Sequence, residues 1–190
     1  MDVLNAQHRR VAELFDHVSA PGEDRPRVLQ DLLKELAAHV AAERSVVQPV
    51  VKSRDIGGEE LPGQLLEDYD RIEKLMVLIE RRKFNSPDLP DLVTELKEVT
   101  DAHISRAEQS LMPGLDSALS VEERSELAEA VSNADSMVTT HPHPHLLSMG
   151  GISAKLTSVL SRFDWMRDKT VTNLPPAKGD GRGSQGGAGL

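Results

Sequence analysis

The chain has 190 residues, 38% hydrophobic and 28% charged, with a formal net charge of −9, which suits one domain with a small addition. It has no cysteine, which excludes disulfides, thiolate metal sites and a cysteine nucleophile, and its 31 Asp and Glu against 22 Lys and Arg argue against nucleic acid as a partner. Because no hydrophobic run is long enough for a membrane helix and the N-terminal residues lack a signal-peptide core, we expect a cytoplasmic protein with no membrane partner.

Hydrophobic residues recur at helical spacing in four stretches, at about residues 1–19, 26–52, 65–83 and 92–113. Glycine and proline separate the stretches, as at Pro21-Gly22 and Gly57-Gly58. Pro49 is expected to kink or end the second helix, and the fourth is expected to end at Pro113. Four long helices joined by short loops predict an all-α fold, an up-down-up-down four-helix bundle.

Beyond the fourth helix we expect smaller additions. Ser120 and Glu123 form a capping-box pattern that begins a short helix, and a second amphipathic stretch runs from Ile152 to Trp165. Residues 179–190 hold six of the 13 glycines and almost no large apolar side chain, which predicts a disordered tail. The predicted divisions are a four-helix bundle at 1–115, a C-terminal helical extension packed on the bundle at 116–175, and the disordered tail at 176–190.

Three of the seven histidines occupy core positions on the predicted helices: His8, His39 and His103. One buried histidine is usually satisfied by a neighbouring group, but three in one bundle can all point to the same interior point. Glu43 follows His39 by four residues, so both side chains face the same side of their helix. Inward-facing carboxylates and histidines of this kind build the di-metal sites of helical bundles.

The fourth helix repeats this pattern with Glu108 five residues after His103, and the histidines of both helices precede a proline by ten residues. On a regular helix, five residues turn a side chain through roughly 140°, nearly off the shared face. Glu108 is therefore either a surface residue or is turned inward by a π-bulge, a distortion that is frequent at functional sites. We favour the inward position.

The order His8, His39-x-x-x-Glu43 and His103-x-x-x-x-Glu108 resembles the hemerythrin-like HHE cation-binding proteins over about residues 1–115. The resemblance implies a non-haem di-iron centre, with two iron ions, that binds O2, nitric oxide or peroxide, or senses iron. In hemerythrin the fourth-helix carboxylate also follows its histidine by five residues and bridges the two irons. This supports Glu108 as a ligand.

On the third helix, Tyr69 stands where the family has a histidine, and Leu65 stands where hemerythrin has another. Tyr69 is either a core aromatic with its hydroxyl bonded to a neighbour or a phenolate ligand. A phenolate stabilises Fe(III) over Fe(II), which penalises reversible O2 binding and suits the polarisation of peroxide. Leu65 cannot bind metal and leaves a coordination position open.

We therefore expect a catalase-like enzyme that disproportionates hydrogen peroxide, with Tyr69 as its catalytic residue. The expected metal ligands are His8, His39, Glu43, Tyr69, His103 and Glu108. The alternative is a protein that binds O2, nitric oxide or iron without turnover, and a metal-free bundle ranks last. The segment His141-Pro-His143-Pro-His145 is expected to be a structural cover, because alternating prolines keep its imidazoles apart. The sequence does not predict the oligomeric state.

Overall fold

The computed structural model describes residues 2–20 and 24–139, whose regular structure is all helical. The label η marks a π-helical turn. The elements are α1 (Asp2–Ser19), α2 (Arg25–Ala42), η1 (Glu43–Val47), α3 (Gln48–Ser53), α4 (Glu60–Glu80), α5 (Leu89–Arg106), η2 (Ala107–Leu111), α6 (Met112–Ala118) and α7 (Val121–Thr139). The His-Pro segment at 141–145, the amphipathic stretch at 152–165 and the predicted tail lie outside the described residues.

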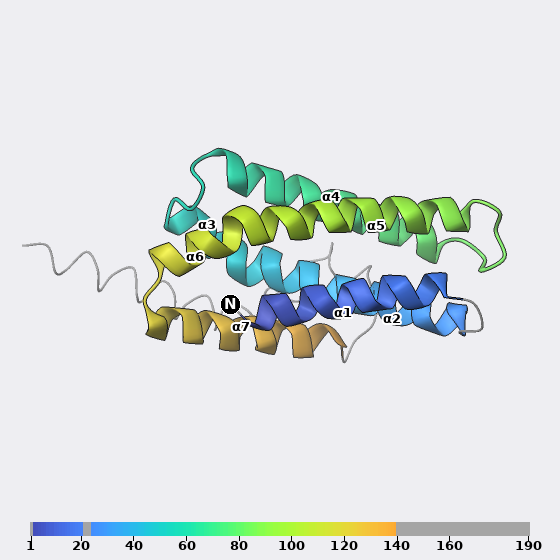
Figure 1. Cartoon of the computed structure of the whole chain (residues 1–190), viewed down its shortest axis with the longest axis horizontal. Coiled ribbons are helices and arrows are strands. Elements are labelled where there is room, and N and C mark those ends of the chain that lie inside the picture. Colours follow the sequence, from blue (N-terminus) through green and yellow to red (C-terminus); the bar gives the residue numbers. More distant parts are fainter. Residues whose placement is uncertain (1, 21–23, 140–190) are drawn as a thin grey trace, which may run out of the picture.

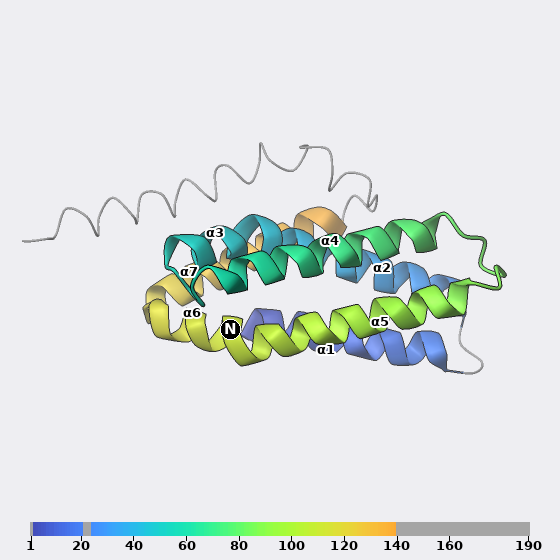
Figure 2. The same cartoon turned by 90° about the horizontal axis from the view of Figure 1, so that it is seen from above.

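The long helices run antiparallel in chain order, which confirms the all-α, up-down-up-down bundle (Figure 1). Helix α1 packs closely on α2, and α4 on α5, so the bundle consists of two helical hairpins laid side by side. Figure 2 shows α1 and α5 along one side of the bundle, lower in this view, and α2 and α4 along the opposite side. We call the line along which α1 and α5 face each other the α1–α5 seam.

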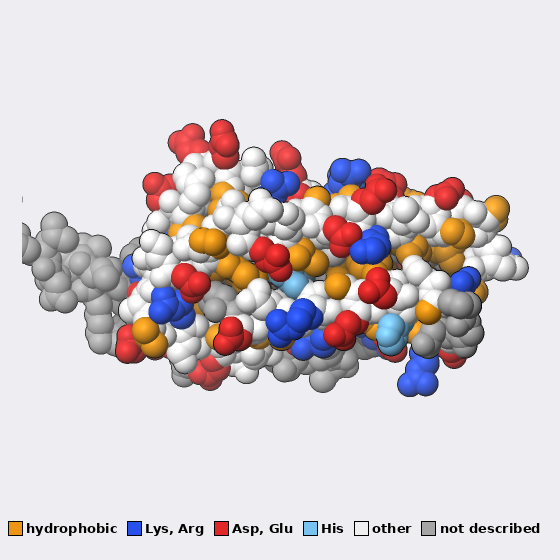
Figure 3. All heavy atoms as spheres, viewed as in Figure 1, with side chains coloured by type: hydrophobic (Ala, Val, Ile, Leu, Met, Phe, Trp, Pro, Cys, Tyr) orange, Lys and Arg blue, Asp and Glu red, His pale blue; other side chains and the backbone are white. Residues whose placement is uncertain are grey.

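Each helix of the bundle turns a hydrophobic stripe towards the interior. Five leucines on these stripes are completely buried: Leu4, Leu32, Leu36, Leu65 and Leu96. Burying one such side chain stabilises a fold by about 1.5–3 kcal/mol. Figure 3 shows that hydrophobic side chains also follow the α1–α5 seam on the outer face, between charged side chains. Among the described helices, none has the length and apolar character needed to cross a membrane.

Two π-helical turns interrupt the second and fourth helices of the bundle. Both η1 and η2 span five residues, and each is followed by a proline in the first turn of the next helix, Pro49 in α3 and Pro113 in α6. The predicted end at Pro113 is wrong, and Pro49 does not end its helix either. In η1 the hydrogen bonding shifts, so that Gln48 N donates to Glu43 O five residues back. Each proline then lies in a first helical turn, where its missing N–H is tolerated.

Helix α7 is a fifth long helix that packs outside the bundle on α2, η1 and α1 (Figure 1). The predicted capping box is confirmed at its start. Ser120 N donates to Glu123 Oε2 at 2.8 Å, and Glu123 N donates to Ser120 Oγ at 3.2 Å. The helix is longer than predicted, with 19 residues, and buries Leu127 and Val131 against the bundle. Because α7 covers η1, it supports the turn that contains Glu43.

Gly114 in α6 allows a close approach to the loop after α3. A Cβ atom at this position would lie 2.3 Å from Cγ2 of the buried, β-branched Ile56. Gly114→Ala is therefore expected to lower the free energy of unfolding by about 1–3 kcal/mol. Gly63 in α4 is the matched control, since a Cβ there meets nothing within 4 Å, and Gly63→Ala should stabilise the chain by about 0.5–1 kcal/mol. Urea unfolding measures both, and a Gly114→Ala chain as stable as the parent would contradict this packing.

Candidate metal centre

Three histidines and one glutamate meet inside the bundle. His8 comes from α1, His39 from the last turn of α2, Glu43 from the first position of η1, and His103 from α5. The exposed fraction is 3% for His8 and 1% or less for the other three side chains. We call these four residues the His/Glu cluster. Their helices place them on hydrophobic faces, and the packing of the two hairpins brings those faces together.

The imidazole rings direct their Nε2 atoms towards the Glu43 carboxylate. His103 Nε2 lies 3.0 Å from Glu43 Oε2, whereas His39 Nε2 and His8 Nε2 lie 3.8 and 3.9 Å from Glu43 Oε1. One candidate ligand atom from each of the four residues lies within 4.8 Å of the others. Ligand atoms at about 2 Å from a shared ion lie roughly 3–4 Å apart. The His/Glu cluster is therefore compatible with a metal ion.

Several buried polar atoms at this point have no hydrogen-bond partner among the described residues. They are both ring nitrogens of His8, both carboxylate oxygens of Glu43, the Tyr69 hydroxyl and His103 Nδ1, although Glu43 Oε2 and His103 Nδ1 each take part in an ion pair, with His103 Nε2 and Asp68 respectively. Each unpaired buried polar atom costs about 1–3 kcal/mol. A cation shared by the carboxylate and the imidazoles would offset that cost, and this nitrogen and oxygen donor set suits iron, manganese or zinc.

Without a metal, burial and the Glu43 carboxylate determine which rings are protonated. Burial lowers the pKa of His39 to about 3. Burial also acts to lower the pKa of His103, but Glu43 and Asp68 on either side of its ring raise it to about 9. Burial alone would raise the pKa of Glu43, yet His39 and His103 hold it below its usual range. The metal-free cluster at neutral pH thus pairs one imidazolium, on His103, with one carboxylate.

Two residues that the sequence analysis missed contact the histidine rings at Nδ1, on the side away from the Glu43 carboxylate. His39 Nδ1 donates to Gln7 Oε1 at 3.2 Å, which leaves the unprotonated Nε2 facing the centre. His103 Nδ1 lies 3.6 Å from Asp68 Oδ2, and Arg106 Nε holds that carboxylate at 2.9 Å. Partners of this kind orient metal-binding imidazoles and raise their basicity. The sequence held one signal for these two residues, since Gln7 and Asp68 each directly precede an expected ligand.

Tyr69 on α4 lies against the His/Glu cluster with a completely buried side chain. Its ring centre is 5.5 Å from that of His103 and 5.6 Å from the guanidinium carbon of Arg44. Burial, together with the negative charge of Glu43, raises the pKa of Tyr69 well above its usual value. In the metal-free chain Tyr69 is therefore a neutral phenol. A nearby cation would favour its ionised form.

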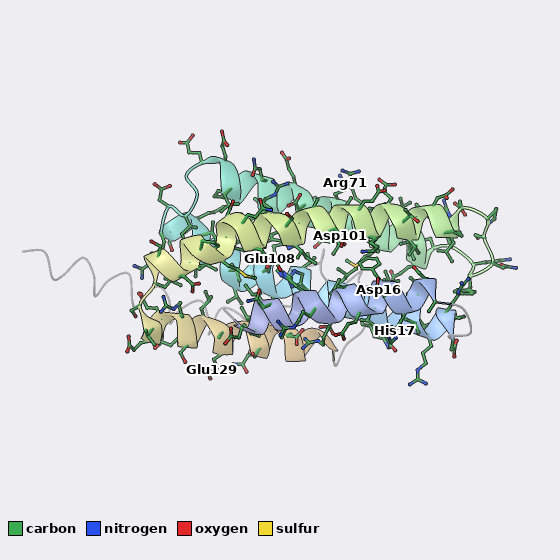
Figure 4. The ribbon with its side chains drawn as sticks, in the orientation of Figure 1. Asp16, His17, Arg71, Asp101, Glu108 and Glu129 are labelled. Atoms are coloured by element: carbon green, nitrogen blue, oxygen red, sulfur yellow. The ribbon has the colours of Figure 1, made fainter. Side chains whose placement is uncertain are left out.

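Glu108 lies outside the His/Glu cluster. The π turn that its inward position required is present as η2, but the Glu108 side chain is exposed and lies at the α1–α5 seam (Figure 4). It is nevertheless near His8. Burial lowers the pKa of His8, and the charges of Glu43 and Glu108 oppose that effect. Four of the six expected ligands thus converge, Tyr69 lies beside them, and Glu108 stands at the rim.

A helical bundle that encloses a buried cluster of histidine and glutamate defines a class of bundle proteins suited to hold metal in their core. The chain belongs to the hemerythrin family, since the model of the hemerythrin HHE cation-binding domain matches residues 1–115. The family resemblance seen in the sequence is therefore confirmed.

Two curated proteins are similar to this chain over most of its length. A DNA nickase of Nostoc sp. (strain PCC 7120) is 29% identical over 144 residues, which are 72% of this chain and 39% of that protein. An uncharacterized hemerythrin-like protein of Schizosaccharomyces pombe is 24% identical over 147 residues, which are 75% of this chain and 72% of that protein. The chain thus spans well under half the length of the first relative. No solved structure matches it significantly.

Proposed function

We propose that the chain binds two iron ions inside the bundle and disproportionates hydrogen peroxide. The observation that carries the proposal is the Tyr69 hydroxyl, which is completely buried beside the His/Glu cluster and interacts with the Glu43 carboxylate. As a phenolate it would be a hard anionic donor that stabilises Fe(III) over Fe(II). Reversible O2 binding needs stable Fe(II), whereas peroxide chemistry tolerates the ferric state. Haem catalases use the same donor, a tyrosine, on their iron.

In this proposal the ligands divide between two ions. The residues that would hold the ions are the four of the His/Glu cluster together with Tyr69 and Glu108. Glu108 would have to turn inward from the exposed position that it has at the α1–α5 seam. Bound iron supplies Lewis acidity and accepts and returns electrons, so that two molecules of hydrogen peroxide become one O2 and two waters.

The remaining contribution of the chain is an enclosed, hydrophobic surrounding for the metal centre. Leu65 lies four residues before Tyr69 on the same helix and is completely buried, but it offers no ligand atom. A small molecule can take the position that a ligand there would fill. The buried leucines around the cluster exclude water and limit the escape of reactive oxygen species. Gln7 and Asp68 keep two of the rings oriented throughout.

Tyr69→Phe in the iron-loaded chain is expected to abolish a visible charge-transfer band and to slow O2 evolution from hydrogen peroxide by at least about tenfold, or roughly 1.4 kcal/mol. The fold should persist, because phenylalanine keeps the shape of the buried ring and the change removes at most one hydrogen bond, worth about 0.5–1.5 kcal/mol. Absorption spectra, an oxygen electrode and the thermal midpoint of the metal-free protein measure the three effects.

Iron analysis of the parent chain is the companion measurement, with about two ions per chain expected from the proposed ligand set. A parent chain that holds iron but evolves no O2 would exclude the peroxide reaction and leave a binding function. A Tyr69→Phe chain that keeps the visible band would show that Tyr69 is not a ligand.

The alternative function is binding of O2, nitric oxide or iron without turnover. The exposed position of Glu108 favours it, because the four buried ligands already form a set for one ion without that residue. A spectrum that changes reversibly when oxygen is removed and readmitted, with no O2 evolved from peroxide, would support this alternative.

The similarity to a DNA nickase keeps nucleic acid open as a partner, although the net charge of −9 opposes binding to phosphates. The match covers 39% of that relative, so most of that protein lies outside the shared part. Incubation of the metal-loaded chain with supercoiled plasmid tests the point. Conversion to relaxed circles would assign a nicking activity to this chain, and unchanged plasmid would leave the peroxide reaction as the proposed activity.

A further inference from the structure

We propose that His8 is a detachable ligand, whose release opens the metal centre to small molecules along the α1–α5 seam. This inference rests on the proposed metal-binding function. It goes further by assigning different strengths to three histidines that the sequence does not distinguish.

The first support is that the three histidine rings differ in the partners of their outer nitrogens. His39 Nδ1 donates to Gln7 Oε1 at 3.2 Å, and His103 Nδ1 faces the Asp68 carboxylate at 3.6 Å. Neither ring nitrogen of His8 has a hydrogen-bond partner among the described residues, whereas His103 Nδ1, also without a hydrogen bond, has its ion pair with Asp68. An outer partner fixes the orientation of an imidazole and strengthens it as a donor. His8 therefore lacks the restraint that holds the other two rings in place.

The second support is the charge of those outer partners. Asp68 is anionic and is itself held by Arg106 Nε at 2.9 Å, so it strengthens His103 most. Gln7 is neutral and strengthens His39 less. With no partner on its outer nitrogen, His8 is the weakest of the three donors, and the expected order of ligand strength is His103, His39, His8.

The third support is the position of His8 at the α1–α5 seam. Helix α1 packs closely on α2, and α5 on α4, whereas α1 and α5 approach each other less closely. His8 comes from α1 and has the largest exposed fraction of the cluster, 3% against 1% or less. A small movement of the His8 ring would therefore open the cluster to solvent, whereas His39 and His103 lie deeper.

The remaining ligands could retain an ion after His8 departs. His39, His103 and Glu43 come from two different hairpins and form a three-residue set, the number of protein ligands that catalytic zinc sites keep beside an open position. Loss of His8 would thus add an open coordination position on the seam side without emptying the site.

Proton NMR of the Co(II)-loaded parent chain tests the inference without a mutation. Ring N–H protons of cobalt-bound histidines shift far from other signals and can be counted individually. We expect the His8 ring proton to exchange with solvent at least about tenfold faster than those of His39 and His103, because its outer nitrogen has neither the hydrogen bond of His39 nor the ion pair of His103. Equal exchange of the three ring protons would overturn the proposal.

Co(II) affinities of single variants, measured by chelator competition, test the same order. His8→Ala is expected to weaken binding by less than about tenfold and to bind added imidazole in the vacated position, whereas His39→Ala and His103→Ala should each lose more than about a hundredfold. His8→Gln, which keeps more of the side-chain volume, replaces His8→Ala if the alanine variant does not fold. If the His8 variants lose cobalt as completely as His103→Ala, the inference about His8 is wrong, but the proposal that the cluster binds metal is unaffected. A parent chain that binds no cobalt overturns both.

Discussion

Glu43→Gln is expected to lower the iron affinity of the chain at least about a hundredfold, which corresponds to roughly 2.7 kcal/mol or more. Glu43 is the one carboxylate in the His/Glu cluster, and its side chain is completely buried. Glutamine has the same shape but no charge, so it cannot balance a cation in a medium where few other charges reach the ion. The loss should appear in competition with a chelator of known affinity for Fe(II).

Glu98→Gln is the matched control, because it makes the same isosteric change at an exposed position of α5. Its iron affinity should equal that of the parent chain. Circular dichroism of both metal-free variants checks that the helices persist. Equal affinity of Glu43→Gln and the parent chain would show that the ion, if bound at all, lies elsewhere.

Metal affinity is expected to rise about tenfold per pH unit between pH 7 and pH 9 and to level off above that range. The reason is that one bound proton must leave. In the metal-free chain the pKa of His103 is raised to about 9 by Glu43 and Asp68 against the effect of burial, whereas burial lowers that of His39 to about 3. At neutral pH His39 and His8, whose pKa burial also lowers, are therefore already unprotonated, and within the His/Glu cluster only His103 releases a proton when an ion binds.

Calorimetry in buffers with different ionisation enthalpies measures the number of protons released, which we expect to be close to one per ion at pH 7.5. Asp68→Asn removes one of the two carboxylates that raise the pKa of His103, so it should reduce this number. An affinity that does not depend on pH would contradict the protonated state assigned to His103. A slope near a hundredfold per unit would mean that a second group, such as the Tyr69 hydroxyl, also releases a proton when the ion binds.

The same pKa shifts determine how the stability of the metal-free chain depends on pH. For His103 the pKa is raised from 6.5 to about 9, so its stabilisation is complete below pH 6.5 and is lost as the pH rises through 9. For His39 the pKa is lowered to about 3, so the unfolded chain takes up a proton first and stability falls as the pH drops from 6.5 towards 3. Urea unfolding of the metal-free protein should therefore show greatest stability near pH 6.5, and Glu43→Gln should weaken the alkaline decline.

The helices of the bundle could be predicted from sequence because their signals are local. Hydrophobic spacing depends on a few neighbouring residues. Helix breaks depend on single residues, such as Gly57 and Gly58, both of which have a positive φ. Capping is local too, and Ser120 and Glu123 make the two hydrogen bonds that their spacing predicts. The ends at proline were predicted less well. Pro113 follows a π turn, and a shift in hydrogen-bond register changes what a proline does to its helix.

The outer support of the rings could not be predicted in the same way. Gln7 and His39 are 32 residues apart in sequence, and Asp68 and His103 are on different helices of the second hairpin. Whether such pairs meet depends on the rotation of each helix about its axis, which no local pattern specifies. Glu108 shows that even a correctly predicted turn does not fix where a side chain points. Its π turn was anticipated from the spacing of His103 and Glu108, but the orientation of the side chain was not.

By itself, the sequence determined the helices, the faces they bury and the residue types that can bind metal, since these follow from a period of 3.6 residues and from side-chain chemistry. It also identified the hemerythrin family over residues 1–115. Only the tertiary structure decided that His8, His39, Glu43 and His103 converge, that Tyr69 lies enclosed beside them, and that Glu108 remains at the rim. The physical reason is that convergence depends on how two hairpins pack against each other and on two π turns that rotate their helices. These properties arise from contacts between residues that are distant in the chain.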